Sequence, residues 1–199
     1  RAFSSADDGR DIVAGSTLVP KISLKPWFEG GGAGKAAVAA ELNHAATNVG
    51  FMGIVDHGFP TDVMEACWGD VRAFFDLSEE EKRKLISPDE ATYPYGYVGF
   101  GGEDLQAGMD VELGKEHVAL PDLKECLSLG PYNPASGMPP PVFPPNPASF
   151  EASWLAYYKA MEDLSGVMLH VFAKALNLEE SYFDAKVDKH RSALRALNY

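Results

Sequence analysis

The stretch Gly50–Pro60, with the sequence G-F-M-G-I-V-D-H-G-F-P, decides how the neighbouring segments fold. Its apolar half contains Ile54 and Val55 between glycines, a pattern that favours a short buried strand over a helix. His57 and the glycine after it predict a sharp turn, and Pro60 stands where a new helix opens. Since helical spacing precedes and follows the stretch, we expect a unit of helix, short strand, turn and helix.

The segment before this strand is predicted to be a helix over residues 35–48 that ends at a left-handed glycine cap, Gly50. Its apolar positions at helical spacing are Val38, Leu42, Ala45 and Val49. The glycine-rich run Gly30–Lys35 before it is interpreted as a flexible connector. A phosphate-binding loop is disfavoured, because Gly30 is too close to Gly34 for that motif and Ala36 offers no hydroxyl to a metal.

The helix after Pro60 carries a wide apolar face that predicts core packing. The face comprises Val63, Met64, Cys67, Trp68, Val71, Phe74 and Phe75. Cys67 is interpreted as a buried thiol and not as a nucleophile, since its neighbours on this face are apolar. A capping box follows, with Ser78 as the N-cap and Glu81 three residues later.

The longest predicted helix opens at Asn146-Pro147 and carries one continuous apolar stripe. The stripe consists of Phe150, Trp154, Tyr157, Met161, Leu164, Met168, Val171 and Ala175. His170 lies beside this stripe and is interpreted as structural. The proline-rich residues 131–148 before the helix predict a rigid, extended connector.

Four further segments have the composition or alternation of strands. Leu18–Leu24 predicts a short edge strand, and Tyr93–Glu103 predicts a strand whose glycines permit a bend. An alternating stretch from Asp122 to Cys126 predicts a half-buried strand. In Ser192–Tyr199 the positions of Leu194, Ala196 and Asn198 alternate with those of Arg195, Leu197 and Tyr199, which predicts a strand that runs to the end of the sequence.

Composition bounds the class of protein. A chain of 199 residues with 46% hydrophobic residues is long enough for one domain with a core of its own. The formal net charge of -12 argues against nucleic acid, because phosphate binding needs clustered Lys and Arg. No apolar run approaches the about 18 residues of a membrane helix.

The cysteines suggest a reducing compartment, and the two ends of the sequence suggest a fragment. Cys67 and Cys126 form no C-x-x-C motif, so two free thiols in a reducing compartment are expected, with one disulfide as the alternative. We therefore expect a cytoplasmic protein; Arg1–Ser5 offers weak support for organellar targeting. Residues 1–17 are interpreted as a disordered leader or transit-peptide remnant. Because the sequence begins without Met and ends within a predicted strand, we expect it to be a fragment at both ends.

Several strings together resemble the isopenicillin N synthase-like family of Fe(II)/2-oxoglutarate dioxygenases. Gly50–Pro60 resembles the family's GFF-x-(I/V)-x-NHG-(I/V)-P, with methionine for its second Phe and aspartate for its Asn. The other matching strings, in the family's order, are Leu18–Leu24, the run F-F-D-L-S-E-E-E-K at 74–82, G-Y-V-G-F-G-G-E at 96–103, D-L-K-E at 122–125, A-L-N-L-E-E-S-Y-F at 175–183 and L-R-A-L-N-Y at 194–199. The Trp of the family's proline-rich N-x-W-P loop is absent.

The resemblance implies an α+β fold, in which an N-terminal helical scaffold with short strands leads into the first strands of an incomplete double-stranded β-helix, or jelly-roll. The implied divisions are a dioxygenase N-terminal domain at 18–130, the connector at 131–148, and the long helix with the start of the jelly-roll at 149–199. The resemblance also implies that Tyr97 lies near the substrate and Asn198 near the co-substrate or metal. The alternative for Tyr97 is that it covers the core.

The iron site of this family is a 2-His-1-carboxylate triad with a His-x-Asp element. None of the five histidines, His44, His57, His117, His170 and His190, begins His-x-Asp or His-x-Glu. By the resemblance the triad lies beyond Tyr199, so we assign neither a metal ligand nor a catalytic residue here. Fe(II) and 2-oxoglutarate are expected in the full-length protein and not in this fragment.

Two functional hypotheses follow. In the first, the chain is the front half of an Fe(II)/2-oxoglutarate-dependent oxidoreductase that hydroxylates, desaturates or closes a ring in a small molecule, and it is not competent alone. In the second, it is a non-catalytic helical binding domain or remnant of the same family, which associates through an exposed apolar seam. A His-x-Asp motif shortly after Tyr199 would distinguish them.

Overall fold

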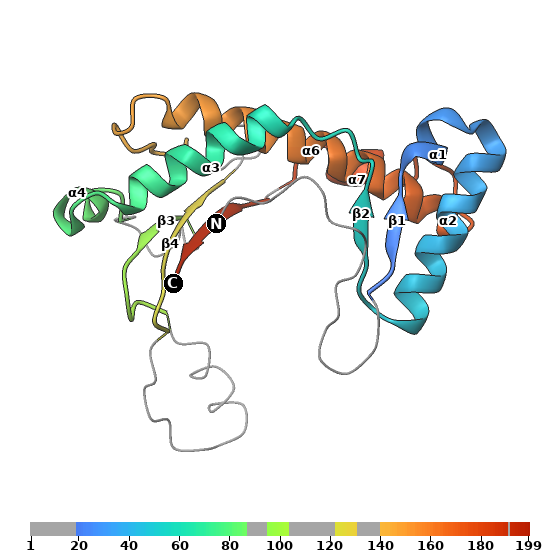
Figure 1. Cartoon of the computed structure of the whole chain (residues 1–199), viewed down its shortest axis with the longest axis horizontal. Helices are drawn as coiled ribbons and strands as arrows, with labels where there is room; N and C mark the ends of the chain where they lie inside the picture. The colour runs from blue at the N-terminus through green and yellow to red at the C-terminus, as the bar shows by residue number, and fades with distance from the viewer. Residues whose placement is uncertain (1–18, 87–94, 104–121, 131–139, 191) are drawn as a thin grey trace, which may run out of the picture. The chain divides into compact units, whose positions relative to one another are not determined.

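The computed structural model describes residues 19–86, 95–103, 122–130, 140–190 and 192–199 (Figure 1). The helices are α1 (Lys25–Glu29), α2 (Gly31–Asn48), α3 (Thr61–Phe75), α4 (Glu79–Arg83), α6 (Phe150–Ala175) and α7 (Asp184–Val187). The strands are β1 (Lys21–Ser23), β2 (Gly53–Val55), β3 (Gly96–Val98), β4 (Glu125–Leu129) and β5 (Leu194–Asn198). The expected mixture of helices and short strands is confirmed. The leader 1–17, His117 and residues 131–139 of the connector lie outside the described residues.

The chain divides into two compact units, each assembled from separate segments. The first unit contains the chain up to Phe59 together with Asp163–Ala185, and the second contains Pro60–Glu162 together with Lys186–Tyr199. Helix α6 therefore contributes its N-terminal part to the second unit and its C-terminal part to the first. The linear domain boundaries expected from the sequence stay a prediction. In the ranges that are described, no helix is long and apolar enough to cross a membrane.

The first unit is built on the parallel pair of β1 and β2, in which Ile22 lies opposite Ile54. Its buried core comprises Ile22, Leu24, Trp27, Val38, Leu42, Ala45 and Val171. Gly50 ends α2 with a φ of 82°, and its N–H donates to the Ala45 carbonyl at 3.0 Å, which confirms the predicted cap. The predicted turn after β2 is also present, with a φ of 71° at Gly58.

The prediction of a flexible connector over Gly30–Lys35 is wrong, because α2 already begins at Gly31. A Cβ atom on Gly34 would lie 2.1 Å from the Pro26 carbonyl oxygen, and one on Gly30 would lie 2.7 Å from the same atom. The glycines therefore allow the first turn of α2 to approach the backbone of α1 more closely than any side chain permits. Their role is close packing and not flexibility.

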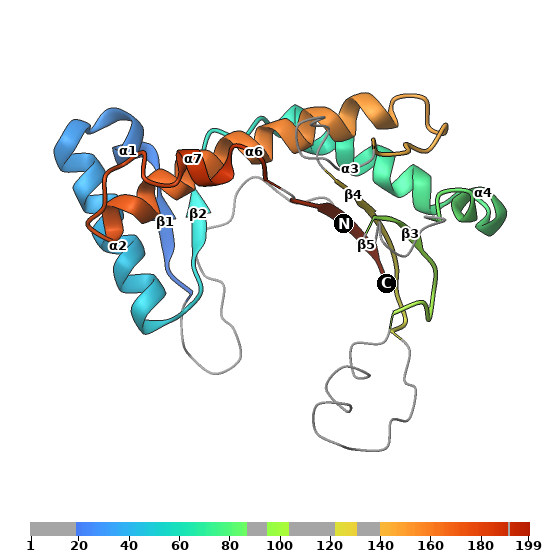
Figure 2. The same cartoon turned by 180° about the vertical axis from the view of Figure 1, so that it is seen from behind.

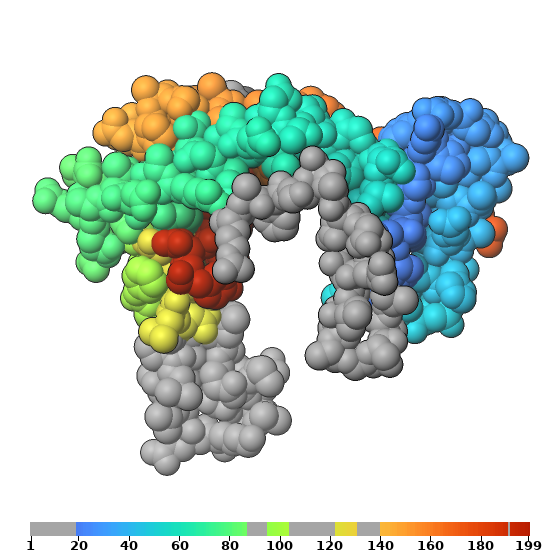
Figure 3. Space-filling view, in the orientation of Figure 1, coloured from blue at the N-terminus to red at the C-terminus, as the bar shows by residue number. Residues whose placement is uncertain are grey.

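The second unit is built on an antiparallel sheet with the strand order β3-β4-β5, as Figure 2 shows from behind. Its buried core, from α3, the turn after α4, α6 and the sheet, comprises Cys67, Val71, Phe74, Phe75, Leu85, Tyr97, Leu127, Leu129, Phe150 and Trp154. Strand β5 alternates as predicted: Leu194, Ala196 and Asn198 are half-buried, and Arg195 and Leu197 are exposed. Atoms of this C-terminal strand are visible on the surface in Figure 3.

Two predictions about helix faces are wrong in part. On α3, Met64 and Trp68 are exposed, because the core contacts of α3 come from the side that carries Cys67, Val71 and Phe74. The Arg72 guanidinium lies over the Trp68 ring, 5.1 Å from its centroid. The apolar stripe of a helix can therefore be wider than the core that the helix meets.

Helix α6 begins at Phe150, three residues later than the predicted start at Pro147. Its predicted stripe is interrupted at Met161, which is exposed. The interruption follows from the division into units, since the buried residues at the two ends of α6 belong to two separate cores.

The strand predicted over Asp122–Cys126 lies further along the chain. Strand β4 runs from Glu125 to Leu129 and is buried on both of its faces, whereas Leu123 is 82% exposed. One face of β4, with Leu127 and Leu129, packs in the core, and on the other face the Arg195 side chain contacts Cys126 and Ser128. The position of a strand in its sheet is not encoded in local alternation.

Candidate polar site of the second unit

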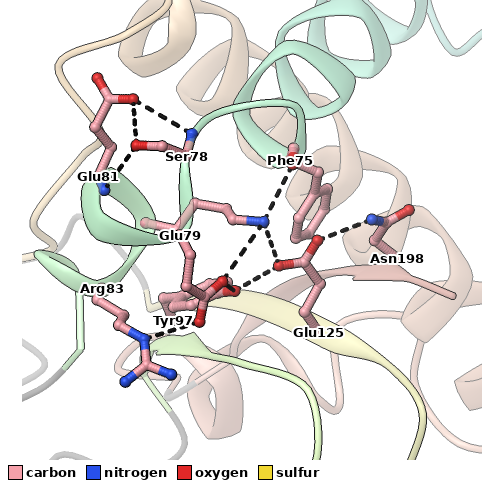
Figure 4. A network of polar contacts seen from close by, with 9 residues as sticks. Phe75, Ser78, Glu79, Glu81, Arg83, Tyr97, Glu125 and Asn198 are labelled. Carbon is pink, nitrogen blue, oxygen red and sulfur yellow. Dashed lines mark hydrogen bonds and ion pairs between the residues drawn. The ribbon is translucent and has the colours of Figure 1, made fainter.

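The centre of the candidate site is the carboxylate of Glu125, buried in the middle strand of the sheet (Figure 4). Lys82 Nζ lies 2.7 Å from Glu125 Oε2, and Tyr97 Oη donates to the same oxygen at 2.5 Å. Asn198 Nδ2 donates to the other oxygen, Oε1, at 2.9 Å. We call these four residues the Glu125 cluster. Both oxygens of the carboxylate are hydrogen-bonded, so burial leaves no oxygen without a partner.

The register of the sheet brings three of these residues to one face. Glu125 lies opposite Asn198, and Tyr97 lies opposite Leu127, two residues further along β4. Because side chains alternate between the faces of a strand, Tyr97, Glu125, Leu127 and Asn198 share the face that packs on the core. The Glu125 cluster is thus a group of polar side chains that adjoins the apolar core of the second unit.

Lys82 comes from α4, and a capping box fixes where this short helix begins. The Glu81 N–H donates to Ser78 Oγ at 3.3 Å, and the Ser78 N–H donates to Glu81 Oε2 at 3.3 Å. This confirms the capping box predicted from the sequence. Lys82 lies one turn after the N-cap Ser78. Its Nζ also donates to the Phe75 carbonyl at 3.2 Å. Lys82 Nζ also lies 3.9 Å from Glu79 Oε2, so the buried ammonium group has three partners.

The charges of the cluster are mutually stabilised. Burial acts to raise the pKa of Glu125, but hydrogen bonds from Lys82, Tyr97 and Asn198 outweigh it, and the pKa lies below its usual value. Burial and the hydrogen bond to Glu125 raise the pKa of Tyr97. The cluster at neutral pH is therefore an ammonium, a carboxylate, a neutral phenol and an amide.

Glu79 forms the exposed rim of the cluster. Its Oε2 lies 3.1 Å from Tyr97 Oη, and its Oε1 accepts from Arg83 Nε at 2.8 Å. The hydrogen bond from Arg83 lowers the pKa of Glu79. Since a phenol has one hydrogen, Tyr97 donates to the closer acceptor, the carboxylate of Glu125.

A second polar group lies on the opposite face of the same sheet. Arg195 Nε donates to Ser128 Oγ at 3.1 Å, and Arg195 Nη2 lies 3.3 Å from Cys126 Sγ and pairs with Glu103. Lys124 Nζ lies 3.3 Å from the other oxygen of Glu103. Burial raises the pKa of the Cys126 thiol, although Arg195 opposes this effect. Lys124 also pairs with Asp122, so two cations face two carboxylates, and the groups named here form no nucleophile–base pair.

The structure brings the two residues predicted from the resemblance, Tyr97 and Asn198, together on one carboxylate. Tyr97 is buried and its hydroxyl is used within the protein, whereas Asn198 is half-buried near the end of β5. That either residue lies near a substrate or co-substrate stays a prediction.

Sequence reasoning missed Lys82 and Glu125, which lie at the centre of the cluster. Both lie inside strings interpreted only as a helix cap and a strand. The available signal was a carboxylate at the head of the apolar run Cys126–Leu129, since a buried carboxylate requires a partner.

The histidines form no metal centre in the described parts of the chain. There, no group of three or more His, Cys, Asp or Glu side chains is placed to hold a metal ion. His170 and His190 instead pair with Asp184 and Glu162, each at 2.8 Å. The Phe59 N–H donates to Nδ1 of His57 at 3.0 Å. Neither Cys67 nor Cys126 is in a disulfide, as expected.

Comparison with known proteins decides the family. The family model described as "non-haem dioxygenase in morphine synthesis N-terminal" matches residues 19–148. The chain belongs to this non-haem dioxygenase family. Among curated relatives, the 2-oxoglutarate-Fe(II) type oxidoreductase hxnY of Emericella nidulans is 27% identical over 195 residues, covering 92% of this chain and 53% of the relative.

Solved structures confirm the fold of a non-haem dioxygenase. A putative 2OG-Fe(II) oxygenase family protein from Caulobacter crescentus superposes with a TM-score of 0.75 at 24% identity, covering 92% of this chain and 57% of that protein. A full-length Neurospora crassa protein, solved in complex with alpha-KG and thymine, superposes with a TM-score of 0.74 at 22% identity, covering 94% of this chain and 56% of that protein. The chain spans about half the length of the curated relatives it matches.

Proposed function

We propose that this chain is the N-terminal half of an Fe(II)- and 2-oxoglutarate-dependent oxidoreductase that hydroxylates, desaturates or closes a ring in a small molecule. The observation that carries the proposal is the family match over residues 19–148. Relatives named as 2-oxoglutarate-Fe(II) type oxidoreductases support the co-substrate. The thymine complex of the Neurospora crassa protein supports a small-molecule substrate.

The residues described here do not fit an iron site. The described histidines are used in contacts with neighbouring side chains or backbone, and no ligand set of suitable composition is present among the described residues. We therefore propose that the His-x-Asp element, the distant His and an Arg that binds 2-oxoglutarate lie beyond residue 199. This chain contributes the helical scaffold and the first strands of the sheet, and the part of the protein beyond residue 199 completes that sheet.

Within this proposal, Tyr97 and Asn198 lie on the strands that adjoin the rest of the sheet, and we place Asn198 near the co-substrate. Tyr97 acts through its hydrogen bond to Glu125, because its hydroxyl is buried. We further propose a cytoplasmic location, in accord with the two free cysteines. The net charge of -12 supports the proposal that no nucleic acid is a partner.

The reading frame beyond Tyr199 tests the proposal. We expect the transcript to continue into His-x-Asp, a distant His and Arg-x-Ser. The longer protein, supplied with Fe(II) and 2-oxoglutarate, should then release succinate. A stop codon directly after Tyr199 would overturn the proposal and favour a non-catalytic binding domain of the same family. A longer protein that carries those residues but consumes no 2-oxoglutarate would overturn it as well.

A further inference from the structure

The orientation of the Asn198 side-chain amide is determined by chemistry. An ionised carboxylate only accepts hydrogen bonds, so the group that faces Glu125 Oε1 at 2.9 Å must be the amide nitrogen of Asn198. The opposite orientation would place two acceptor oxygens against each other. The Asn198 Oδ1 atom therefore points away from Glu125, as Figure 4 shows.

The carboxylate is itself held in place. Lys82 Nζ and Tyr97 Oη both bond to Glu125 Oε2, which leaves Oε1 for Asn198. Lys82 is in turn fixed by the Phe75 carbonyl and by the capped start of α4. A chain of defined contacts thus runs from α4 through β4 to the last residue of β5.

We propose that Glu125, held by Lys82, is a positioning residue for the reaction. It locks Asn198 so that Oδ1 is presented as a hydrogen-bond acceptor for a donor group at the co-substrate end of the site, such as a hydroxyl, an amide N–H or a bound water. This inference rests on the proposed function. Acceptor geometry excludes direct binding of an ionised carboxylate by Oδ1, since both groups only accept.

A reciprocal exchange of residues tests this orientation. In Glu125→Gln, the single remaining acceptor oxygen stays with Lys82 and Tyr97, since the Lys82 ammonium cannot accept from an N–H₂ group. The glutamine N–H₂ then faces Asn198, whose amide must flip. In the double variant E125Q/N198D, the aspartate accepts from that N–H₂ and again presents an oxygen outwards. The double variant also restores a negative charge near Lys82.

The expected result in the longer protein is a loss of about tenfold or more in kcat/KM for 2-oxoglutarate in E125Q, because the flipped amide leaves the donor group in the site without its acceptor. N198A should lose as much, and E125Q/N198A no more than N198A. The reciprocal variant E125Q/N198D should recover most of the loss. The control is Glu80→Gln, the same chemical change at an exposed position of α4, which should leave kcat/KM unchanged.

A purely structural cluster gives a different pattern. In that case N198A would keep wild-type kcat/KM, E125Q would lose activity only in proportion to its melting temperature, and N198D would not rescue it. Each of these results overturns the inference. If the wild-type longer protein consumes no 2-oxoglutarate, the proposed function fails together with this role.

The contact itself is tested separately, on the 199-residue chain, by NMR of the Asn198 side-chain amide. We expect one amide hydrogen to be shifted downfield and protected in the wild type, and this signature to be absent in E125Q. An unchanged Asn198 signal in E125Q overturns the inference, whatever the activity of the longer protein.

Discussion

At the scale of the residue, Glu125 and Lys82 are coupled charges that the fold can hold only together. Glu125 is 2% exposed and Lys82 is 6% exposed, so water solvates neither. Such a pair adds little stability compared with apolar residues of the same volume, but removing one partner leaves a buried charge uncompensated. The pair therefore specifies how α4 meets the sheet more than it stabilises the fold.

Lys82→Met is expected to destabilise the chain by about 3–5 kcal/mol at pH 7, because it leaves the Glu125 carboxylate buried without its cation. The double variant K82M/E125Q should be less destabilised than K82M, since it removes both charges. Urea unfolding measures both values. Lys84→Met is the matched control at an exposed position and should change stability by less than about 0.5 kcal/mol.

The difference in unfolding free energy between wild type and K82M should decrease as the pH falls. The pKa of Glu125 in the folded chain lies below its ordinary value of 4.5, so the stability it contributes is complete above 4.5. That contribution is lost as the pH falls through the folded pKa. Wild type and K82M should therefore converge in stability on acidification. A gap that stays constant from about pH 7 to about pH 3 would contradict the ion pair.

Cys67 should be unreactive in the folded chain. Burial and the nearby Asp70 raise the pKa of its thiol to about 11 from 9.0. At about pH 8 the thiolate fraction is then about one in a thousand, roughly 100-fold below that of the ordinary thiol. Alkylation by iodoacetamide, followed by mass spectrometry of the Cys67 peptide, should be at least about 100-fold slower than in urea. Equal rates in the two conditions would contradict the burial of this thiol.

At the scale of the element, the features predicted correctly are those whose physics is local. The Ser78 capping box satisfies N–H groups within one turn, and Gly50 ends α2 at a positive φ of 82°. The sequence therefore sufficed for the start of α4 and the end of α2, but not for the starts of α2 and α6. It did not suffice for the exposed Trp68, since what covers a helix face is decided by distant segments.

The glycines at the start of α2 likewise show that a contact with another segment can override the structure that the local sequence favours. Local propensity favours a loop over Gly30–Lys35, but contact with the α1 backbone makes helix the better state. Similarly, Lys82 and Glu125 are 43 residues apart in sequence. No local pattern joins them, so the Glu125 cluster had to be seen in the folded chain.

Gly34→Ala is expected to destabilise the first unit by about 1–3 kcal/mol, because the new methyl group would meet the Pro26 carbonyl at 2.1 Å. Gly32→Ala, two residues earlier in the same helix, meets nothing within 4 Å. It should stabilise the chain by up to about 1 kcal/mol. Thermal unfolding of the two variants checks the contrast. Equal effects would show that close approach does not explain the glycines.

At the scale of the whole molecule, the family could be recognised from the order of short strings, and the family match confirms it. The division into two units could not, because each unit joins segments that lie far apart in the sequence. Chain order alone suggested linear domains.

The 199-residue chain by itself should neither turn over 2-oxoglutarate nor develop an absorption band that depends on Fe(II) and 2-oxoglutarate together. The reason is that none of its five histidines begins the His-x-Asp or His-x-Glu element that the iron site requires. Anaerobic titration with Fe(II) and 2-oxoglutarate, and a succinate assay, measure the two properties. The longer protein provides the positive control. Detecting either signal with this chain would show that the metal ligands lie within it.

The sharing of α6 between two cores has a consequence for its dynamics. Phe150 and Trp154 anchor one end of this 26-residue helix, Val171 and Ala173 anchor the other, and Met161 between them is exposed. Half of such a helix is too short to persist in water without packing. Hydrogen–deuterium exchange along α6 should therefore show two protection levels, each set by the opening free energy of its own core. A cavity made in one core by Leu42→Ala would deprotect the C-terminal half alone, so one continuous helix would melt as two cooperative units.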